Sequence, residues 1–315
     1  MRKFSQITII IVALLIIMGF AAQAVWSDDV SDLNNYPNSA RIIAMGNIGE
    51  SLPLNSTGMF GNPASIWQIS GIEYSLMYYP HDDDNTYIHS AALMYSHGKI
   101  TEFFGLRVGF RAIPENRKYF NFDIPEHHYR MGVFGMAYAI TKLAVIGVSG
   151  DIYQNKLEDK DGTAFGVNIG AQIRLSILTL SATARNIAKI NNSENDYEKI
   201  ELPSAINSGA YVSLLDGIIG LGIQAELGSG GKILRYSLGS EFTFGKFLSI
   251  RAGHETTNLE FNEDEIDESL FSFGCGINLG NLRADYAAKK NPELEDDYIH
   301  YVTFGINGTD FGQKK

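Results

Sequence analysis

The sequence has little of what soluble enzymes and helical membrane proteins usually contain. It has one cysteine in 315 residues, which excludes a disulfide framework and any metal site built from several cysteines. Charged residues make up only 19%, and 25 Lys and Arg face 36 Asp and Glu, a balance that argues against binding to nucleic acid. After residue 24 there is no apolar run of the roughly 18 residues that a spanning helix requires. What is abundant is glycine (32), tyrosine (16) and phenylalanine (18), a composition that fits an all-β chain.

Residues 1–24 have the pattern of an export signal peptide. Two basic residues precede an apolar stretch from Ile7 to Phe20, and Ala22-Gln23-Ala24 is a small-residue cleavage site. An uncleaved anchor helix is the alternative, but the small residues and the polar segment after them favour cleavage. Any later membrane span must consist of strands, because only helices and closed barrels satisfy the backbone in lipid.

From residue 71 onward, short runs of alternating apolar and polar residues are separated by turn residues. In the run 163–174, for example, Phe165, Val167 and Ile169 share one face, and glycine or polar residues occupy the other. The length of most runs is close to the roughly 9–11 residues with which a tilted strand crosses a bilayer. We expect fourteen strands, at 71–79, 86–96, 102–113, 128–140, 143–154, 163–174, 177–187, 204–215, 218–227, 233–244, 247–254, 269–279, 281–289 and 298–307.

The connections between these runs differ in length in a regular way. Tight turns such as Thr141-Lys142 and Asp216-Gly217 alternate with long acidic connections, which we expect at 80–85, 114–127, 155–162, 188–203, 255–268 and 290–297. Long loops at one rim, tight turns at the other and an even strand count are typical of outer-membrane barrels. A soluble β-sandwich or another secreted β protein is the alternative, although it has no reason to sort its loops by length. We therefore predict a single transmembrane antiparallel β-barrel of about 14 strands.

If the apolar face of this barrel meets lipid, its other face lines the lumen. Charges there require pairing or hydration. We interpret them as ion pairs that link the inner wall and close the lumen, with an anion-selective path as the alternative. The predicted lumen residues are Arg107, Arg111, Arg174, Arg185, Arg235, Arg251, Arg283, Glu241 and Asp285.

The residues that usually carry catalysis form no constellation here. The seven histidines are scattered, no G-x-S-x-G occurs, and the acidic clusters lack the spacing of a calcium loop. We predict no enzyme activity, no metal site and no cofactor. Solvated loops explain the acidic clusters, and a divalent bridge to anionic lipid is the alternative.

Residues 25–70 do not alternate, and we interpret them as a plug-like segment that precedes a barrel at 71–307 and a tail at 308–315. Asn62-Pro63 is a turn signal, and Pro63 is suited to the first position of a short helix through Trp67. So apolar a segment needs a surface to bury against, and the lumen or the mouth of the barrel is the nearest one.

Three short motifs in this segment resemble the N-terminal signature of a known family. Ala40-Arg41, Met45-Gly46 and Asn62-Pro63-Ala64 occur in the order found in PorV/PorQ proteins, which are outer-membrane barrels related to the FadL fatty-acid transporters. The penultimate strand, Leu282 to Ala287, is similar to that of the family as well. An Asp often precedes the Asn-Pro-Ala turn in this superfamily, whereas this chain has Asn55-Ser56-Thr57-Gly58. The resemblance marks Arg41, Met45, Gly46, Asn62, Pro63 and Ala64 as the motif residues of the plug.

The resemblance implies a non-enzymatic barrel in the outer membrane of a Gram-negative type cell that assists protein secretion or surface attachment by the type IX route. Its partners would be outer-membrane lipid and either secreted cargo or other secretion components. The alternative is a FadL-like channel for hydrophobic or small solutes, with a hydrophobic ligand as its partner. A third interpretation is a barrel that only anchors or spaces the envelope. These functions rest on analogy, because a fold does not determine a function.

Overall fold

The computed structural model describes residues 39–53, 56–67, 69–81, 84–112, 127–157, 160–192, 202, 204–228, 233–245, 247–261, 264–291 and 297–308. The expected signal peptide and nearly all of the expected C-terminal tail lie outside these ranges. No helix within them is both long enough and apolar enough to cross a membrane.

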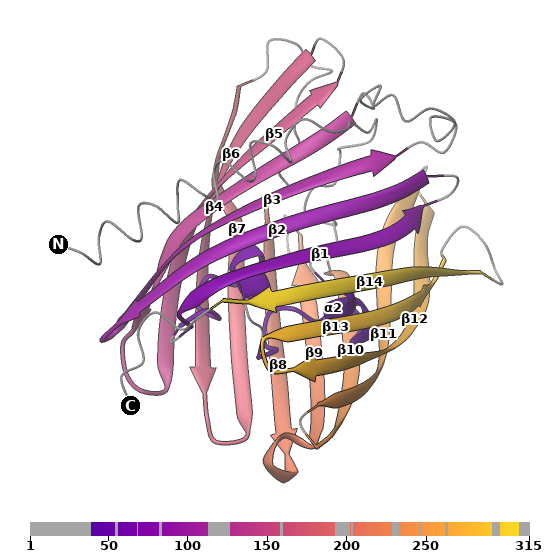
Figure 1. The fold of residues 1–315 in the computed structure, drawn as a ribbon. Coiled ribbons are helices and arrows are strands. Elements are labelled where there is room, and N and C mark those ends of the chain that lie inside the picture. Colours follow the sequence, from indigo (N-terminus) through magenta and orange to yellow (C-terminus); the bar gives the residue numbers. More distant parts are fainter. Residues whose placement is uncertain are drawn as a thin grey trace.

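Fourteen antiparallel strands form one closed barrel, in which each strand pairs with its neighbours in sequence (Figure 1). The first and last strands close it through six residue pairs, from Glu73 opposite Asn307 to Tyr78 opposite Val302. This confirms the predicted barrel and excludes the β-sandwich. The strands are β1 (Gly71–His81), β2 (Asp84–His97), β3 (Ile100–Ala112), β4 (His127–Ala139), β5 (Ala144–Leu157), β6 (Lys160–Arg174), β7 (Leu178–Asn192), β8 (Ala205–Leu214), β9 (Ile219–Leu227), β10 (Ile233–Phe244), β11 (Leu248–Phe261), β12 (Asp264–Leu279), β13 (Leu282–Lys290) and β14 (Tyr298–Asn307).

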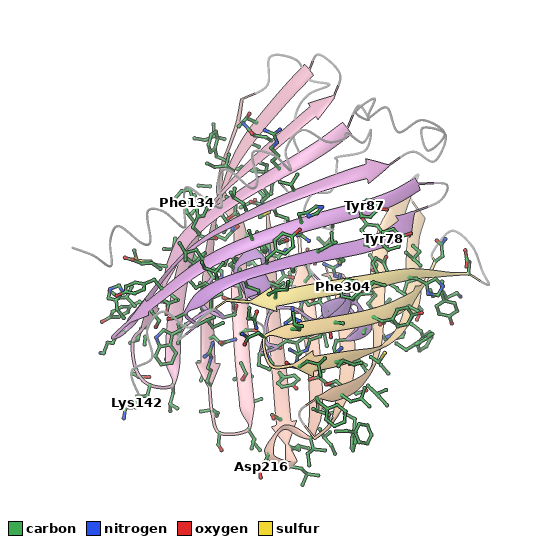
Figure 2. All side chains as sticks on the ribbon, in the orientation of Figure 1. Tyr78, Tyr87, Phe134, Lys142, Asp216 and Phe304 are labelled. Carbon is green, nitrogen blue, oxygen red and sulfur yellow. The ribbon has the colours of Figure 1, made fainter. Side chains whose placement is uncertain are left out.

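The outer face of the barrel is apolar, because side chains alternate between the two faces of a strand and the apolar residues of each run share the outer one. Large apolar side chains such as Ile169, Ile223 and Phe304 are about half exposed on it, and the labelled Phe134 and Phe304 lie on the outside of the wall (Figure 2). Lys142 and Asp216 lie at the rim of tight turns, at the bottom of the view (Figure 2). We call this end the tight-turn rim and the other end the opposite rim.

Three of the expected long loops are wrong, because their residues extend the strands. The described residues of these loops continue three ladders, β1–β2 as far as the pair His81–Asp84, β5–β6 as far as Leu157–Lys160, and β11–β12 as far as Phe261–Asp264. Backbone pairing persists there although apolar alternation has ended. Alternation therefore marks the part of a strand with one apolar face and misses its polar extension.

Strand β4 alternates poorly in sequence because both of its faces are apolar. Met131, Val133 and Ala137 are buried on the inside, whereas Phe134 and Met136 are exposed on the outside. The inner residues belong to an apolar cluster that also contains Ile66 and Trp67, from the segment before the barrel.

That segment lies inside the barrel (Figure 1). It contains α2 (Ala40–Ala44) and the 3-10 helix η1 (Ser56–Phe60), and a second 3-10 helix, η4 (Leu215–Gly217), forms the β8–β9 turn. The helix expected from Pro63 through Trp67 is wrong. Successive turns occupy this stretch, with Ser65 N donating to Asn62 O and Trp67 N to Ala64 O. We call residues 39–53 the first lobe and residues 56–67 the second lobe of the plug.

Candidate functional site: the plug and its seat in the barrel

Helix α2 fastens the start of the first lobe to the wall. Ser39 caps the helix by accepting a hydrogen bond from Ile42 N at 3.3 Å. The backbone N–H of Ala40 donates to Thr303 Oγ1 of β14 at 2.9 Å. Ile43 and Ala44 pack with residues of β1, β2, β13 and β14 in a buried apolar cluster. The helix is thus held by burial and by a bond to the wall, although it has only five residues.

Arg41 connects the first lobe to a row of charged side chains on the wall. Its guanidinium donates two hydrogen bonds to Glu241 of β10, at 3.1 and 2.8 Å. Burial alone would lower the pKa of Arg41, but the carboxylates of Glu241 and Asp285 outweigh it, so the pKa of the guanidinium is raised. Arg41 is therefore charged and held by a bidentate ion pair.

The row continues across three more strands. Arg251 donates to Glu241 at 2.5 Å and to Asp285 at 2.8 Å. Arg283 lies 3.0 Å from Asp285 Oδ2, as an ion pair without hydrogen-bond geometry, and 3.5 Å from Glu73 Oε1. Three guanidinium groups thus balance three carboxylates in a buried network. We call this set the Arg41 network; it consists of Arg41, Glu73, Glu241, Arg251, Arg283 and Asp285.

Gly46 lies where the plug approaches the backbone of the wall. Its φ is +70°, and a Cβ built on it would lie 2.6 Å from the carbonyl oxygen of Leu238 and 2.7 Å from that of His254. The wall at this point is the facing pair Gly239 and Gly253. A Cβ on Gly253 would in turn collide with the backbone of Gly46. Only glycine fits on both sides of this contact.

The turn after Met45 carries a second buried ion pair. Met45, fully buried, packs in the cluster of first-lobe residues around Tyr211. The N–H groups of Gly49 and Glu50 both donate to Gln224 Oε1, at 2.9 and 3.0 Å. The Glu50 carboxylate accepts from Arg185 at 2.7 Å and from Thr183 at 2.6 Å, both on β7.

The Asn-Pro-Ala turn seats the second lobe on β5 and β6. Asn62 Nδ2 donates to the carbonyl of Ala171 at 3.2 Å, and its Oδ1 accepts from Ala64 N at 2.9 Å. A Cβ on Gly147 would lie 2.5 Å from the N atom of Ala64 and the carbonyl carbon of Pro63. The asparagine therefore shapes the turn and binds the wall with one side chain, and a wall glycine admits the turn.

Two arginines pack on aromatic rings of the second lobe. Arg107 lies over Phe60, with 5.4 Å from its Cζ to the ring centroid, and Arg174 lies over Trp67 at 5.8 Å. Arg174 also donates to the carbonyl oxygen of Ser65 at 2.7 Å.

The predicted lumen residues fall into three groups. Arg107, Arg174 and Arg185 contact the plug directly, as described above. Glu241, Arg251, Arg283 and Asp285 belong to the Arg41 network, and Arg235 pairs with Glu226 of β9. Arg111 lies in β3, but its side chain is not among those that the structure describes.

Sequence reasoning missed several partners. Glu73 shares the inward phase of Ser75 and Met77 in an expected strand, so the period of two was a usable signal. Glu255, paired with Lys289 at 2.6 Å, was assigned to a loop. Glu50 lies in a segment without periodicity, and no sequence signal marks it.

The described residues hold no group of three or more His, Cys, Asp and Glu side chains that is placed to bind a metal ion. His89, His254 and His300 each contact a hydroxyl group of a neighbouring strand, as in the pair Tyr286–His300 at 2.7 Å.

Neither a family model nor a curated protein matches this sequence. Solved structures do match its fold. The toluene transporter TodX of P. putida is 12% identical with a TM-score of 0.59, and the match covers 90% of this chain and 100% of that one. The toluene transporter TbuX of Ralstonia pickettii (12% identity, TM-score 0.53, 86% and 98%) and a FadL homologue of Pseudomonas aeruginosa (10%, 0.53, 87% and 98%) are similar as well. The chain shares the barrel fold of FadL-like outer-membrane transporters.

Proposed function

We propose that this protein is an outer-membrane channel through which hydrophobic or small solutes pass, with residues 39–67 as its plug. The observation that carries the proposal is the way in which these residues occupy the lumen. The first lobe contacts β7 through β14 as well as β1 and β2, and the second lobe contacts β2 through β6, so the plug contacts the wall around its whole circumference. Because this segment contacts the wall on all sides, a solute crosses only when the segment moves.

The similar transporters support this proposal at the level of fold. Two of them are described as toluene transporters, and in this chain the inner face of β4, which packs against Trp67, is apolar. We expect a solute with an apolar body to be accepted.

Uptake by intact Gram-negative cells tests the proposal. Cells that express the protein should take up radiolabelled toluene and benzyl alcohol faster than cells with an empty vector. The control strain expresses a comparable amount of a variant in which an oxidised disulfide between Ser51→Cys and Gly209→Cys fixes the plug to the wall. Equal uptake in all three strains would contradict a transport role.

The secretion role implied by the PorV/PorQ resemblance remains a prediction. Its motif residues, from Arg41 to Ala64, all contribute to the structure of the plug or its contacts with the wall, and such contacts suit a channel as well as a secretion component. Co-purification of the tagged protein with secreted cargo from its own host tests this role. Recovery of the barrel alone, together with measurable solute uptake, would favour the channel.

A further inference from the structure

The outer wall carries a group of polar side chains at the opposite rim, where β13 ends and β14 begins (Figure 1). Asp285 and Lys289 of β13 form ion pairs inside the lumen. Because side chains alternate between the two faces of a strand, Tyr286 and Lys290 face outward. Lys290 is the last residue of β13, and within the described part of the chain it forms no ion pair. The wall thus presents an unpaired ammonium group on its outer face.

The strand register brings the polar side chains of β13 and β14 into one cluster. Tyr298 lies directly opposite Lys290, and His300 lies opposite Ala288, between the two outward polar residues of β13. The hydroxyl oxygen of Tyr286 and the Nδ1 of His300 are 2.7 Å apart. Neighbours on one face of two paired strands have Cβ atoms about 5–8 Å apart. We call Tyr286, Lys290, Tyr298 and His300 the outer cluster.

An apolar surface adjoins the outer cluster on the side of the tight-turn rim. Phe273 of β12 contacts Tyr298 edge to face across β13, with 5.6 Å between the ring centroids. Ala288 lies between these two rings and is fully buried although it faces outward, because the larger side chains of β12 and β14 cover it. Ile277 and Phe304, farther along the same face, are about half exposed. A polar end and an apolar surface therefore meet at this place.

The outer cluster lies at the depth of lipid headgroups. Strand β13 has nine residues, from Leu282 at the tight-turn rim to Lys290. A tilted strand of roughly 9–11 residues crosses a bilayer once, so the two ends of β13 lie at its two surfaces. The tight turns of bacterial outer-membrane barrels face the periplasm, which places Lys290 at the outer leaflet.

The outer cluster offers a positive charge and several hydrogen-bond donors. The ammonium group of Lys290 has three N–H donors, and the hydroxyl group of Tyr298 has one donor. When Tyr286 donates to Nδ1 of His300, the ring proton lies on Nε2, which is a further donor. The carboxylate of Asp297 accepts from the backbone N–H of Tyr298 at 2.8 Å and does not pair with Lys290. A phosphate group, with its negative charge and several acceptor oxygens, matches this set of donors.

We propose that the outer cluster binds the phosphate group of an outer-leaflet lipid whose acyl chains lie along the apolar wall at Phe273 and Phe304. Phosphate is the anion that membrane lipids carry at this depth. A free phosphate ion has the same acceptor oxygens, but it gains nothing from the apolar surface. The proposal concerns the outer face of the barrel and does not depend on which solutes cross it.

Binding to the purified protein in a nonionic detergent tests the proposal. The probes are lipid A, the same lipid without its phosphate groups, and inorganic phosphate, and native mass spectrometry measures the bound lipid. We expect lipid A to bind more tightly than its dephosphorylated form, and inorganic phosphate at an equal concentration not to displace it. Equal binding of the two lipids would overturn the proposal and reduce the cluster to an aromatic girdle. Displacement by inorganic phosphate would overturn it in favour of a site for the free ion.

Matched variants test whether the outer cluster is the binding site. Lys290→Gln should weaken binding of lipid A about fivefold, the usual contribution of one basic residue near anionic lipid. Lys142→Gln removes an exposed lysine at the tight-turn rim and should leave binding unchanged. His300→Leu removes the ring donor and should weaken binding severalfold. All three variants should keep the heat-dependent mobility shift in SDS gels, which shows that the barrel is folded. Binding that is equally weak in the Lys142 and Lys290 variants, or unchanged in the Lys290 and His300 variants, would overturn the proposal.

Discussion

Gly46 shows how a single residue determines whether the plug fits its seat. Two constraints act on it, a left-handed backbone and the nearby backbone oxygens of β10 and β11. The first constraint alone costs a residue with a side chain about 1–2 kcal/mol. The second constraint is steric, because the backbone atoms of β10 and β11 are paired in a ladder and cannot move away from an added Cβ.

We predict that Gly46→Ala displaces the first lobe. Limited proteolysis should cut within residues 39–53, while the barrel keeps its heat-dependent mobility shift in SDS gels. The control is Gly98→Ala in the β2–β3 turn, which has a similar φ of +61° and no atom within 4 Å of the added Cβ. Equal proteolysis of the two variants would show that the wall contact does not hold the plug.

Glu241 joins the plug to the wall electrostatically. We predict that Glu241→Gln lowers the free energy of unfolding by about 3–5 kcal/mol, because it leaves Arg41 and Arg251 buried with too little negative charge. The control is Glu226→Gln, whose ion pair with Arg235 is more exposed, so its loss should be smaller. Thermal unfolding in detergent measures both variants. An equal effect would contradict a special role for the Arg41 network.

At the scale of elements, the strands form the seat of the plug through their glycines. We predict that Gly253→Ala in β11 loosens the first lobe without opening the barrel, since the added Cβ would collide with Met45 and Gly46. Gly305→Ala in β14 is the matched control, because the nearest atom to its Cβ lies at 3.7 Å. Hydrogen exchange should rise in residues 40–50 for the first variant only. Exchange that rises equally across β11 and β12 would instead indicate damage to the wall.

The strands themselves were predictable because the membrane requires a period of two. All fourteen were found in order, and their centres agree, as for 163–174 within β6. Their ends were not, because the end of β11 from Glu255 to Phe261 carries mostly polar residues in both phases, and apolar alternation is lost there. Three predicted loops failed for this one reason.

The site was predictable only in part. Short motifs marked Arg41, Gly46 and Asn62, but not what they touch. Gly46 meets Ser272, 226 residues away in the sequence, at a hydrogen-bond distance of 3.2 Å. Such a contact follows from barrel closure and the register of every strand between them. Helix α2 has only five residues, which is too short for its apolar residues to show a helical period in the sequence.

For the whole molecule, the apolar outer face predicts a lipid environment. We predict that Ile223→Arg, in the middle of β9, costs about 2–4 kcal/mol of folding free energy in bilayers. Leu215→Arg at the tight-turn rim, 66% exposed in η4, should cost about 0–1 kcal/mol. Refolding into lipid vesicles measures both. Similar values for the two variants would contradict a membrane-spanning position for β9.

The central claim is that solutes cross this barrel only when the plug moves, and a reversible lock tests it most directly. Ser51→Cys and Gly209→Cys, in a Cys275→Ser background, place two thiols close enough for a disulfide between plug and wall, since a Cβ on Gly209 lies 3.1 Å from Ser51 Oγ. Uptake of labelled benzyl alcohol by cells is measured before and after reduction, with each single-cysteine variant as a control. We predict that oxidation lowers uptake to the level of cells without the protein and that reduction restores it. Uptake at the native rate with the disulfide formed would contradict the claim.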